Sequence, residues 1–111
     1  MFNMFDMMGK VKEFQTRLAE AKEKLVHITH TSEAGAGMVK VTVNGRKQVI
    51  KLELDNDLIK PEDKEMLTDL ILAATNKALA EVDELAKQHI QKATEGLIPN
   101  IPGLDIFKHL G

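Results

Sequence analysis

Residues 35–45 read Gly-Ala-Gly-Met-Val-Lys-Val-Thr-Val-Asn-Gly, and this stretch indicates the fold class. From Val39 to Val43, valine alternates with a polar residue, which is the period of a strand with one buried and one solvated face. Asn44-Gly45 is a residue pair that favours a two-residue type I′ turn. A second alternating segment, residues 49–54, follows at once, so the sequence predicts a β-hairpin.

The predicted turn also fixes which residues of the hairpin lie opposite each other. A two-residue turn places Val39 opposite Ile50 on the buried face. The outer face then collects the basic residues of the hairpin, namely Lys40, Lys47 and Lys51, with Arg46 at the turn. Residues 38–54 carry a net charge of +3, so we expect a basic sheet surface.

The segment before the hairpin has the heptad spacing of a long helix. Its apolar residues fall into two sets three residues apart, Met4, Val11, Leu18 and Leu25, and then Met7, Phe14, Ala21 and Ile28. This spacing predicts a helix from about Met4 to about Ile28. Such a helix is longer than a small core can cover, so part of it must protrude or meet a second chain.

A second long helix is predicted after the hairpin. Pro61 suits the first helical position and Gly96 suits the end. Residues 28–34 are β-prone and supply a first strand. The predicted fold class is therefore α+β: a helix, a three-stranded antiparallel meander and a second helix in one domain, residues 1–95. A tail interrupted by Pro and Gly, but rich in apolar residues, occupies 96–111.

Composition excludes several functional classes. The chain has 111 residues and no Cys, which rules out disulfides, thiolate zinc sites and Cys nucleophiles. No apolar run approaches the ~20 residues of a membrane span, and the first residues do not resemble a signal peptide, so we expect a cytoplasmic protein. No set of residues combines a nucleophile, a base and an orienting group, so we expect neither an enzyme nor a cofactor or small-molecule substrate.

Two patterns that could indicate a metal site have a simpler explanation. The N-terminal methionines could bind copper(I), but they fall on the heptad positions, where Met fills a core. His27 and His30 would point to opposite faces of a strand, with no carboxylate close by. We therefore predict no metal site. Gly35-Ala36-Gly37 is not a nucleotide loop either, because it precedes a strand.

The net charge of −2 conceals a segregation of charge along the chain. Residues 1–28 carry +1, the hairpin +3 and residues 55–95 carry −5. Clustered Lys and Arg attract phosphates through counterion release, whereas the alternative is a solvated face whose lysines discourage aggregation. The candidate phosphate contacts are Lys12, Arg17, Lys22 and Lys24 in the first helix and Lys40, Arg46, Lys47 and Lys51 in the sheet. Some helix cations are expected to be neutralised by Glu81, Asp83 or Glu84, so the residues alone favour the sheet set.

The pattern resembles the YbaB/EbfC family of bacterial nucleoid-associated proteins over most of residues 1–95. The resemblance is carried by residues 35–45, by Leu52-Glu53-Leu54-Asp55 with Leu58, and by residues 63–71 and 73–78. It implies a homodimer in the cytoplasm and nucleoid, with helical arms beside a shared sheet. The implied function is binding of double-stranded DNA with little or relaxed sequence preference, together with a role in nucleoid organisation and gene regulation.

The resemblance favours the helical arms over the sheet as the DNA contact. The chain departs from the family pattern at Thr75-Asn76-Lys77, where the family often has an aromatic residue before Asn-Asp, and in its apolar tail. A second hypothesis is a protein–protein adaptor that uses the heptad helix or the tail to hold a partner.

Overall fold

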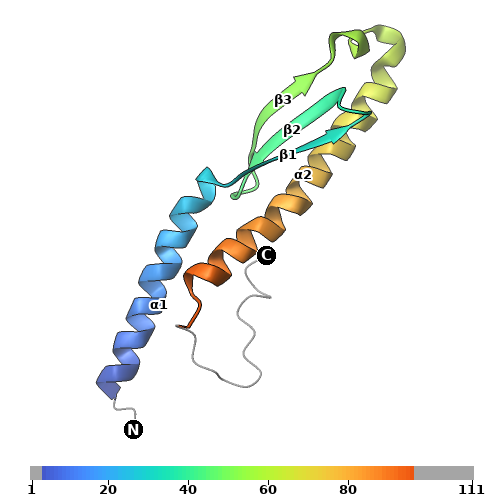
Figure 1. Cartoon of the computed structure of the whole chain (residues 1–111). Helices are drawn as coiled ribbons and strands as arrows, with labels where there is room; N and C mark the ends of the chain where they lie inside the picture. Colours follow the sequence, from blue (N-terminus) through green and yellow to red (C-terminus); the bar gives the residue numbers. More distant parts are fainter. Residues whose placement is uncertain (1–3, 97–111) are drawn as a thin grey trace.

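The computed structural model describes residues 4–96, which form two long helices and a three-stranded sheet (Figure 1). The elements in order are α1 (Met4–Lys24), the 3-10 turn η1 (Leu25–His27), the strands β1 (Thr29–Ala34), β2 (Val39–Asn44) and β3 (Val49–Leu54), the 3-10 turns η2 (Asn56–Leu58) and η3 (Pro61–Asp63), and α2 (Lys64–Ala93). This order confirms the predicted fold class. The apolar segment 97–111 lies outside the described residues.

The sheet is an antiparallel meander with the strands in the order β1-β2-β3. Helix α2 packs across β1 and β2 on one side of the sheet, while β3 lies at the uncovered edge (Figure 1). Val49, Ile50 and Leu52 of β3 consequently keep 51%, 53% and 48% of their surface exposed. The apolar side chains of this edge strand are therefore about half exposed.

The core is a thin layer between β2 and α2. Val39, Val41 and Val43 are completely buried, as the alternation of the sequence predicts, and they belong to one cluster with Ala74 and Ala78. The helix meets the valines with small side chains, so the helix backbone can approach the sheet closely. Val82 and Leu58 complete the buried cluster.

The connection between β2 and β3 is longer than the predicted two-residue turn. The Asn44 N–H donates to the Gln48 carbonyl at 3.0 Å, which encloses a three-residue loop whose last residue, Lys47, has a φ of 62°. The Asn44 side chain stabilises this loop, because its Oδ1 accepts hydrogen bonds from the backbone N–H groups of Arg46 and Gln48. Three-residue hairpin loops commonly consist of a type I turn followed by one residue in the left-handed conformation. In this loop that residue is Lys47.

The longer loop corrects the predicted register. Val39 lies opposite Leu54 and not opposite Ile50, and Ile50 is an extra residue between the pairs Thr42–Lys51 and Val43–Val49. The partner of Val39 thus lies four residues further along β3 than predicted. Because side chains alternate between the two faces of a strand and four is an even number, both partners lie on the same face of the sheet. Lys40 and Lys51 therefore share the outer face as predicted, whereas Lys47 does not.

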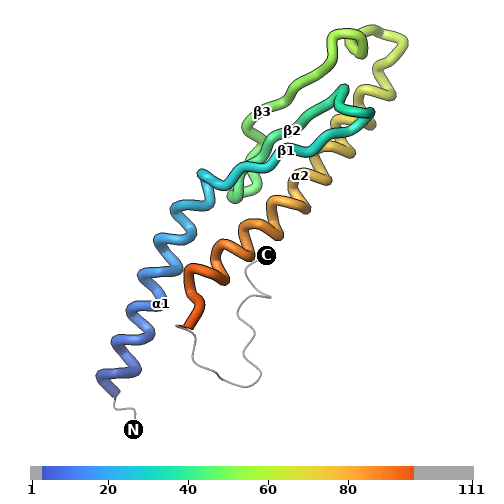
Figure 2. The backbone as a smooth tube through the Cα atoms, viewed as in Figure 1, coloured from blue at the N-terminus to red at the C-terminus, as the bar shows by residue number. Residues whose placement is uncertain are grey.

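Helix α1 projects from the sheet, beside the C-terminal half of α2 (Figures 1 and 2). Its last part is packed, with Ala21 buried, but Met4 and Phe5 near its start are 75% and 83% exposed. This confirms that part of the helix protrudes from the core. The α-helical hydrogen bonding ends at Lys24, earlier than predicted, because a 3-10 turn leads directly into β1.

Helix α2 begins at Lys64, since Pro61 opens a 3-10 turn and not the helix itself. The molecule is an elongated body of 71 × 25 × 16 Å. Neither described helix combines the length and the apolar character that crossing a bilayer would require.

Candidate nucleic-acid interface

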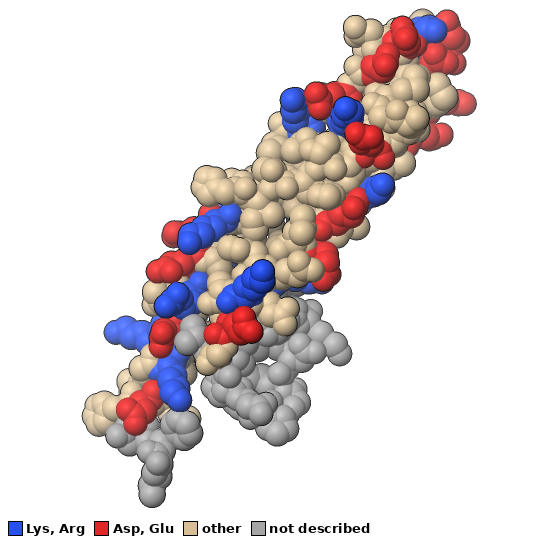
Figure 3. Space-filling model, in the orientation of Figure 1, with Lys and Arg blue, Asp and Glu red and all other residues tan. Residues whose placement is uncertain are grey.

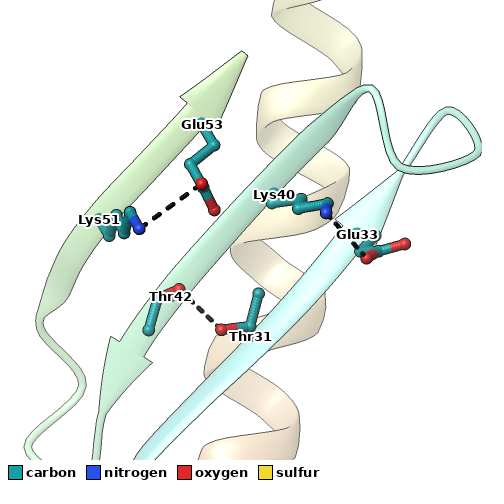
Figure 4. Close-up of polar contacts among 6 residues, drawn as sticks. All are labelled: Thr31, Glu33, Lys40, Thr42, Lys51 and Glu53. Atoms are coloured by element: carbon teal, nitrogen blue, oxygen red, sulfur yellow. Dashed lines mark hydrogen bonds and ion pairs between the residues drawn. The ribbon is translucent and has the colours of Figure 1, made fainter. Parts of the chain in front are cut away.

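Two lysines and two glutamates lie beside one another on the outer face of the sheet, Lys40 with Glu33 and Lys51 with Glu53 (Figure 4). Lys40 Nζ lies 3.8 Å from Glu33 Oε1, and Lys51 Nζ lies 3.5 Å from Glu53 Oε1. The hydroxyls of Thr31 and Thr42 form a hydrogen bond of 2.7 Å between them. The register explains this balance, because it sets Glu33 opposite Lys40 on one side and Glu53 opposite Lys40 on the other. The expectation of a basic outer face is therefore wrong.

Lys47 points toward α2 and not toward the outer face. Its Nζ lies 3.1 Å from Asp83 Oδ1, and Lys87 Nζ lies 3.2 Å from Asp83 Oδ2. The pKa of Asp83 is lowered, chiefly by the hydrogen bond from Lys47 and less by Lys87, although burial acts in the opposite direction. Lys47 thus attaches the hairpin loop to α2. Arg46, next to it, is exposed, and its guanidinium forms no ion pair within residues 4–96.

A second polar contact attaches β1 to α2. Ser32 Oγ donates to Glu81 Oε1 at 2.9 Å, and His30 Nε2 lies 3.4 Å from Glu81 Oε2. The pKa of Glu81 is lowered, first by the hydrogen bond from Ser32, while desolvation opposes this and the charges of His30 and Lys77 add to it. The prediction that no carboxylate lies near His30 is therefore wrong.

Within residues 4–96, Glu81, Asp83 and Glu84 of α2 form no ion pair with Lys12, Arg17, Lys22 or Lys24 of α1. Glu81 contacts β1, and Asp83 contacts Lys47 and Lys87, so the expected pairing with α1 is not formed. Glu84 has no ion-pair partner in the described part of the chain. The sequence could not show this, because the loop that brings Lys47 to Asp83 depends on a left-handed lysine.

The four predicted cations of α1 are all exposed on the projecting helix. They are Lys12, Arg17, Lys22 and Lys24, and none of them forms an ion pair with any residue between 4 and 96. Arg17 and Lys24 lie seven residues apart and so share one side of the helix. Figure 3 shows Lys and Arg side chains over α1, interleaved with acids.

Charge is separated along the length of the molecule. Residues 55–69 contain six acidic residues and two lysines, for a net charge of −4. They form η2, η3 and the start of α2, at the opposite end from the N-terminus of α1 (Figures 1 and 3). The acidity that the sequence places in residues 55–95 is thus concentrated far from the α1 cations.

The residue that the sequence interpretation missed is Glu33. Glu33 lies opposite Lys40 only because the loop between β1 and β2 has four residues, 35–38. A turn of Gly-Ala-Gly alone would place Glu33 opposite Val39, so the sequence does not indicate this pairing. Side chains that bind metals do not gather in groups of three or more anywhere in residues 4–96.

Comparisons with known proteins identify the family of the chain. Residues 1–97 match the model of the YbaB/EbfC DNA-binding family. A nucleoid-associated protein of Syntrophobacter fumaroxidans is 45% identical over 102 residues, covering 92% of this chain and 91% of that protein. A nucleoid-associated protein of Bacillus thuringiensis is 44% identical over 103 residues, covering 93% of each chain.

A solved structure has the same fold. The crystal structure of the uncharacterised protein HP0035 from Helicobacter pylori aligns with a TM-score of 0.68 at 28% identity, covering 79% of this chain and 92% of that one. The matching family is described by DNA binding and not by an enzymatic activity. The family match spans most of the chain, and the relatives are matched over nearly their whole length, so this chain is a member of the YbaB/EbfC DNA-binding family.

Proposed function

We propose that this protein is a nucleoid-associated protein that binds double-stranded DNA as a homodimer, with little sequence preference, through the cations of α1. The observation that carries the proposal is a set of four exposed cations on the projecting helix, Lys12, Arg17, Lys22 and Lys24, which form no ion pair with any residue from 4 to 96. The sheet cations are weaker candidates. Lys40, Lys47 and Lys51 each already lie beside a carboxylate, and among the described residues only Arg46 of that set does not.

The chemistry of these side chains supports contact with phosphates and not with bases. Lys and Arg neutralise phosphates and release counterions, and the binding free energy gained in this way does not depend on the DNA sequence. The chain has no Trp or Tyr and four Phe, so it has little from which to build a surface for stacking bases. Both features favour duplex DNA as the partner and relaxed specificity.

The homodimer is supported by apolar surface that a single chain leaves exposed. Val49, Ile50 and Leu52 of β3 form one such area, and Met4 and Phe5 of α1 belong to another. Two copies also present two sets of α1 cations to one duplex. Once the first set is bound, the second set is held close to the same duplex, which raises the overall affinity. A cytoplasmic location on the nucleoid follows from this function, and a fluorescent fusion should coincide with the DNA stain in cells.

The test is fluorescence anisotropy with a random duplex at two salt concentrations. We expect tight binding at low salt, a steep loss at high salt and little change when the duplex sequence is shuffled. No binding at low salt, or binding that ignores salt, would overturn the DNA assignment. Light scattering on a sizing column tests the dimer separately, and a monomer at micromolar concentration would overturn that part.

The exposed start of α1 also supports a second candidate, a protein–protein adaptor. Met7, Met8 and Val11 continue the apolar surface of Met4 and Phe5, with exposed fractions of 50% or more. Met-rich apolar helix faces adapt to several partners. An adaptor predicts that replacing Phe5 by Ser abolishes partner capture, whereas the proposed function predicts that DNA affinity survives this change.

A further inference from the structure

Helix α2 covers the apolar side of α1 along only part of its length. Ala21 is 2% exposed and Phe14 is half-buried. Toward the start of α1 the exposed fraction rises to 50% at Val11, 57% at Met7 and 75% at Met4. These residues occupy the heptad positions and so form one continuous side of the helix. The part of this side that α2 does not cover is the open seam, defined by Met4, Met7 and Val11.

The open seam begins where α2 ends. The two helices run antiparallel, and the C-terminal end of α2 lies beside the middle of α1 (Figures 1 and 2). Helix α2 ends at Ala93, and Thr94 and Ile90 near its end are 0% and 4% exposed. Gly96 then has a φ of 80°, the left-handed conformation that commonly ends a helix. The chain therefore leaves α2 at the point from which the open seam continues along α1.

The segment 97–111 follows Gly96 and contains seven large apolar side chains, among them Leu104 and Phe107. Their burial is favourable in proportion to the apolar area that is removed from water. At ~3.3 Å per extended residue the segment spans up to ~50 Å, whereas Met4 and Val11 are separated by only ~10 Å along the helix axis. The segment is thus long enough and apolar enough to cover the open seam.

We propose that the segment 97–111 docks on the open seam of α1 in the same chain, and that it continues toward Met4 the packing that α2 provides from Phe14 onward. The contact goes beyond the proposed function, because neither DNA nor a second copy takes part in it. A segment attached to the same chain is present at the seam at an effective concentration of ~1 mM. A second copy has no such advantage, since it must be supplied from solution.

The docking surface does not include the whole apolar start of α1. Successive residues of a helix are rotated by about 100° around its axis, so Phe5 lies well to one side of Met4 and still further from Met7 and Val11. Phe5 is 83% exposed. Docking on the open seam leaves Phe5 and the apolar side chains of β3 to the homodimer. Phe5 is therefore the matched control for the residues of the open seam.

Paramagnetic NMR tests the contact in the full chain. Lys108→Cys supplies a single thiol for a nitroxide, because the natural chain has no Cys. We expect the methyl signals of the open seam to lose most of their intensity and to recover it when the nitroxide is reduced. Met66, near the start of α2 and far from the open seam, should keep its signal. Unchanged signals from the open seam would overturn the proposal, and so would stronger broadening at Ile50 of β3.

Variants of the spin-labelled chain test which side of α1 is covered. Met7→Ser/Val11→Ser should abolish the broadening at Met4, because it removes most of the apolar seam. Phe5→Ser should leave this broadening unchanged. A Phe5→Ser variant that loses the broadening as completely as the double variant would overturn the proposed surface.

Variants of the segment itself test whether its apolar side chains make the contact. Leu104→Ser/Phe107→Ser should abolish the broadening of the open seam, whereas Asp105→Asn, the control within the same segment, should preserve it. Broadening that survives the double variant would overturn the proposal.

A mixed sample distinguishes docking within one chain from docking between copies. It combines chains that carry the NMR isotopes but no nitroxide with chains that carry the nitroxide but no isotopes. We expect the open seam to keep its signals in this mixture. Broadening as strong as in the doubly labelled chain would show that the segment reaches a second copy, and it would overturn docking in the same chain.

Discussion

The backbone N–H of Gly45 donates a hydrogen bond to the Leu25 carbonyl over 2.9 Å, and a second one to the Ile28 carbonyl over 2.8 Å. These bonds attach the base of α1 to the hairpin loop. A Cβ atom at position 45 would lie 2.5 Å from the Leu25 oxygen, too close for any residue but glycine. Glycine is required here by the approach of two backbones, and the contact fixes the direction in which α1 projects.

Replacing Gly45 by Ala should therefore destabilise the protein. We expect the free energy of unfolding to fall by about 2 kcal/mol or more, because the backbone must shift to relieve the contact. Gly9→Ala is the matched control, since nothing lies within 4 Å of a Cβ there and an exposed helix gains up to about 1 kcal/mol. Urea denaturation measures both, and equal effects would contradict the proposed role of Gly45.

Removing the buried side chain of Leu58, in the acidic segment 55–69, should reduce the stability of the fold. Leu58 is 2% exposed and belongs to the core cluster. Leu58→Ala should lower the free energy of unfolding by about 2–5 kcal/mol through lost burial and a cavity. Leu72→Ala removes the same atoms from a residue that is 56% exposed, and it should cost much less. A comparable loss in both variants would show that Leu72 is buried in the assembly.

The ion pair between Lys47 and Asp83 should be visible in an acid titration. The pKa of Asp83 is lowered from its ordinary value of 3.8. Because the pKa of Asp83 is lower in the folded state, its carboxylate stabilises the fold at pH values above 3.8, and this stability is lost as the pH falls through the folded-state pKa. Lys47→Gln should raise the pKa of Asp83 and reduce this acid-dependent loss.

Carboxyl carbon NMR gives the pKa of Asp83, and urea denaturation at neutral and acid pH gives the stability. Lys87→Gln is the control and should raise the pKa less, because Lys47 makes the larger contribution. A larger effect of Lys87→Gln would mean that the hairpin loop does not hold Lys47 against α2.

The DNA contact should map to α1. Lys22→Gln/Lys24→Gln should weaken binding to random duplex and reduce the slope of log K against log salt by ~0.9 for each lost phosphate contact. Lys60→Gln/Lys64→Gln, which removes the same charge from the acidic end, should change neither quantity. If Lys40→Gln/Lys51→Gln has the larger effect, the sheet and not α1 is the contact surface.

Local sequence pattern determines those features of the fold that depend on residues close together in the chain. The alternation of Val39, Val41 and Val43 predicts both the strand and its buried face, because each depends on neighbours two residues away. The position of Lys47 could not be predicted, since it depends on a loop whose glycine is held by Leu25. The neutral outer face depends on Glu33 and Glu53, which reach Lys40 only through pairing of distant segments.

The separation of charge along a body 71 Å long gives the molecule an electric dipole. Near any polyanion, this dipole experiences a torque that turns α1 inward and the acidic end outward before contact is made. Salt at physiological strength screens beyond ~8 Å, so the alignment operates only in the last approach. Misaligned encounters with a polyanion are thereby corrected without any specific contact, so residues 55–69 help to orient the molecule through their charge alone.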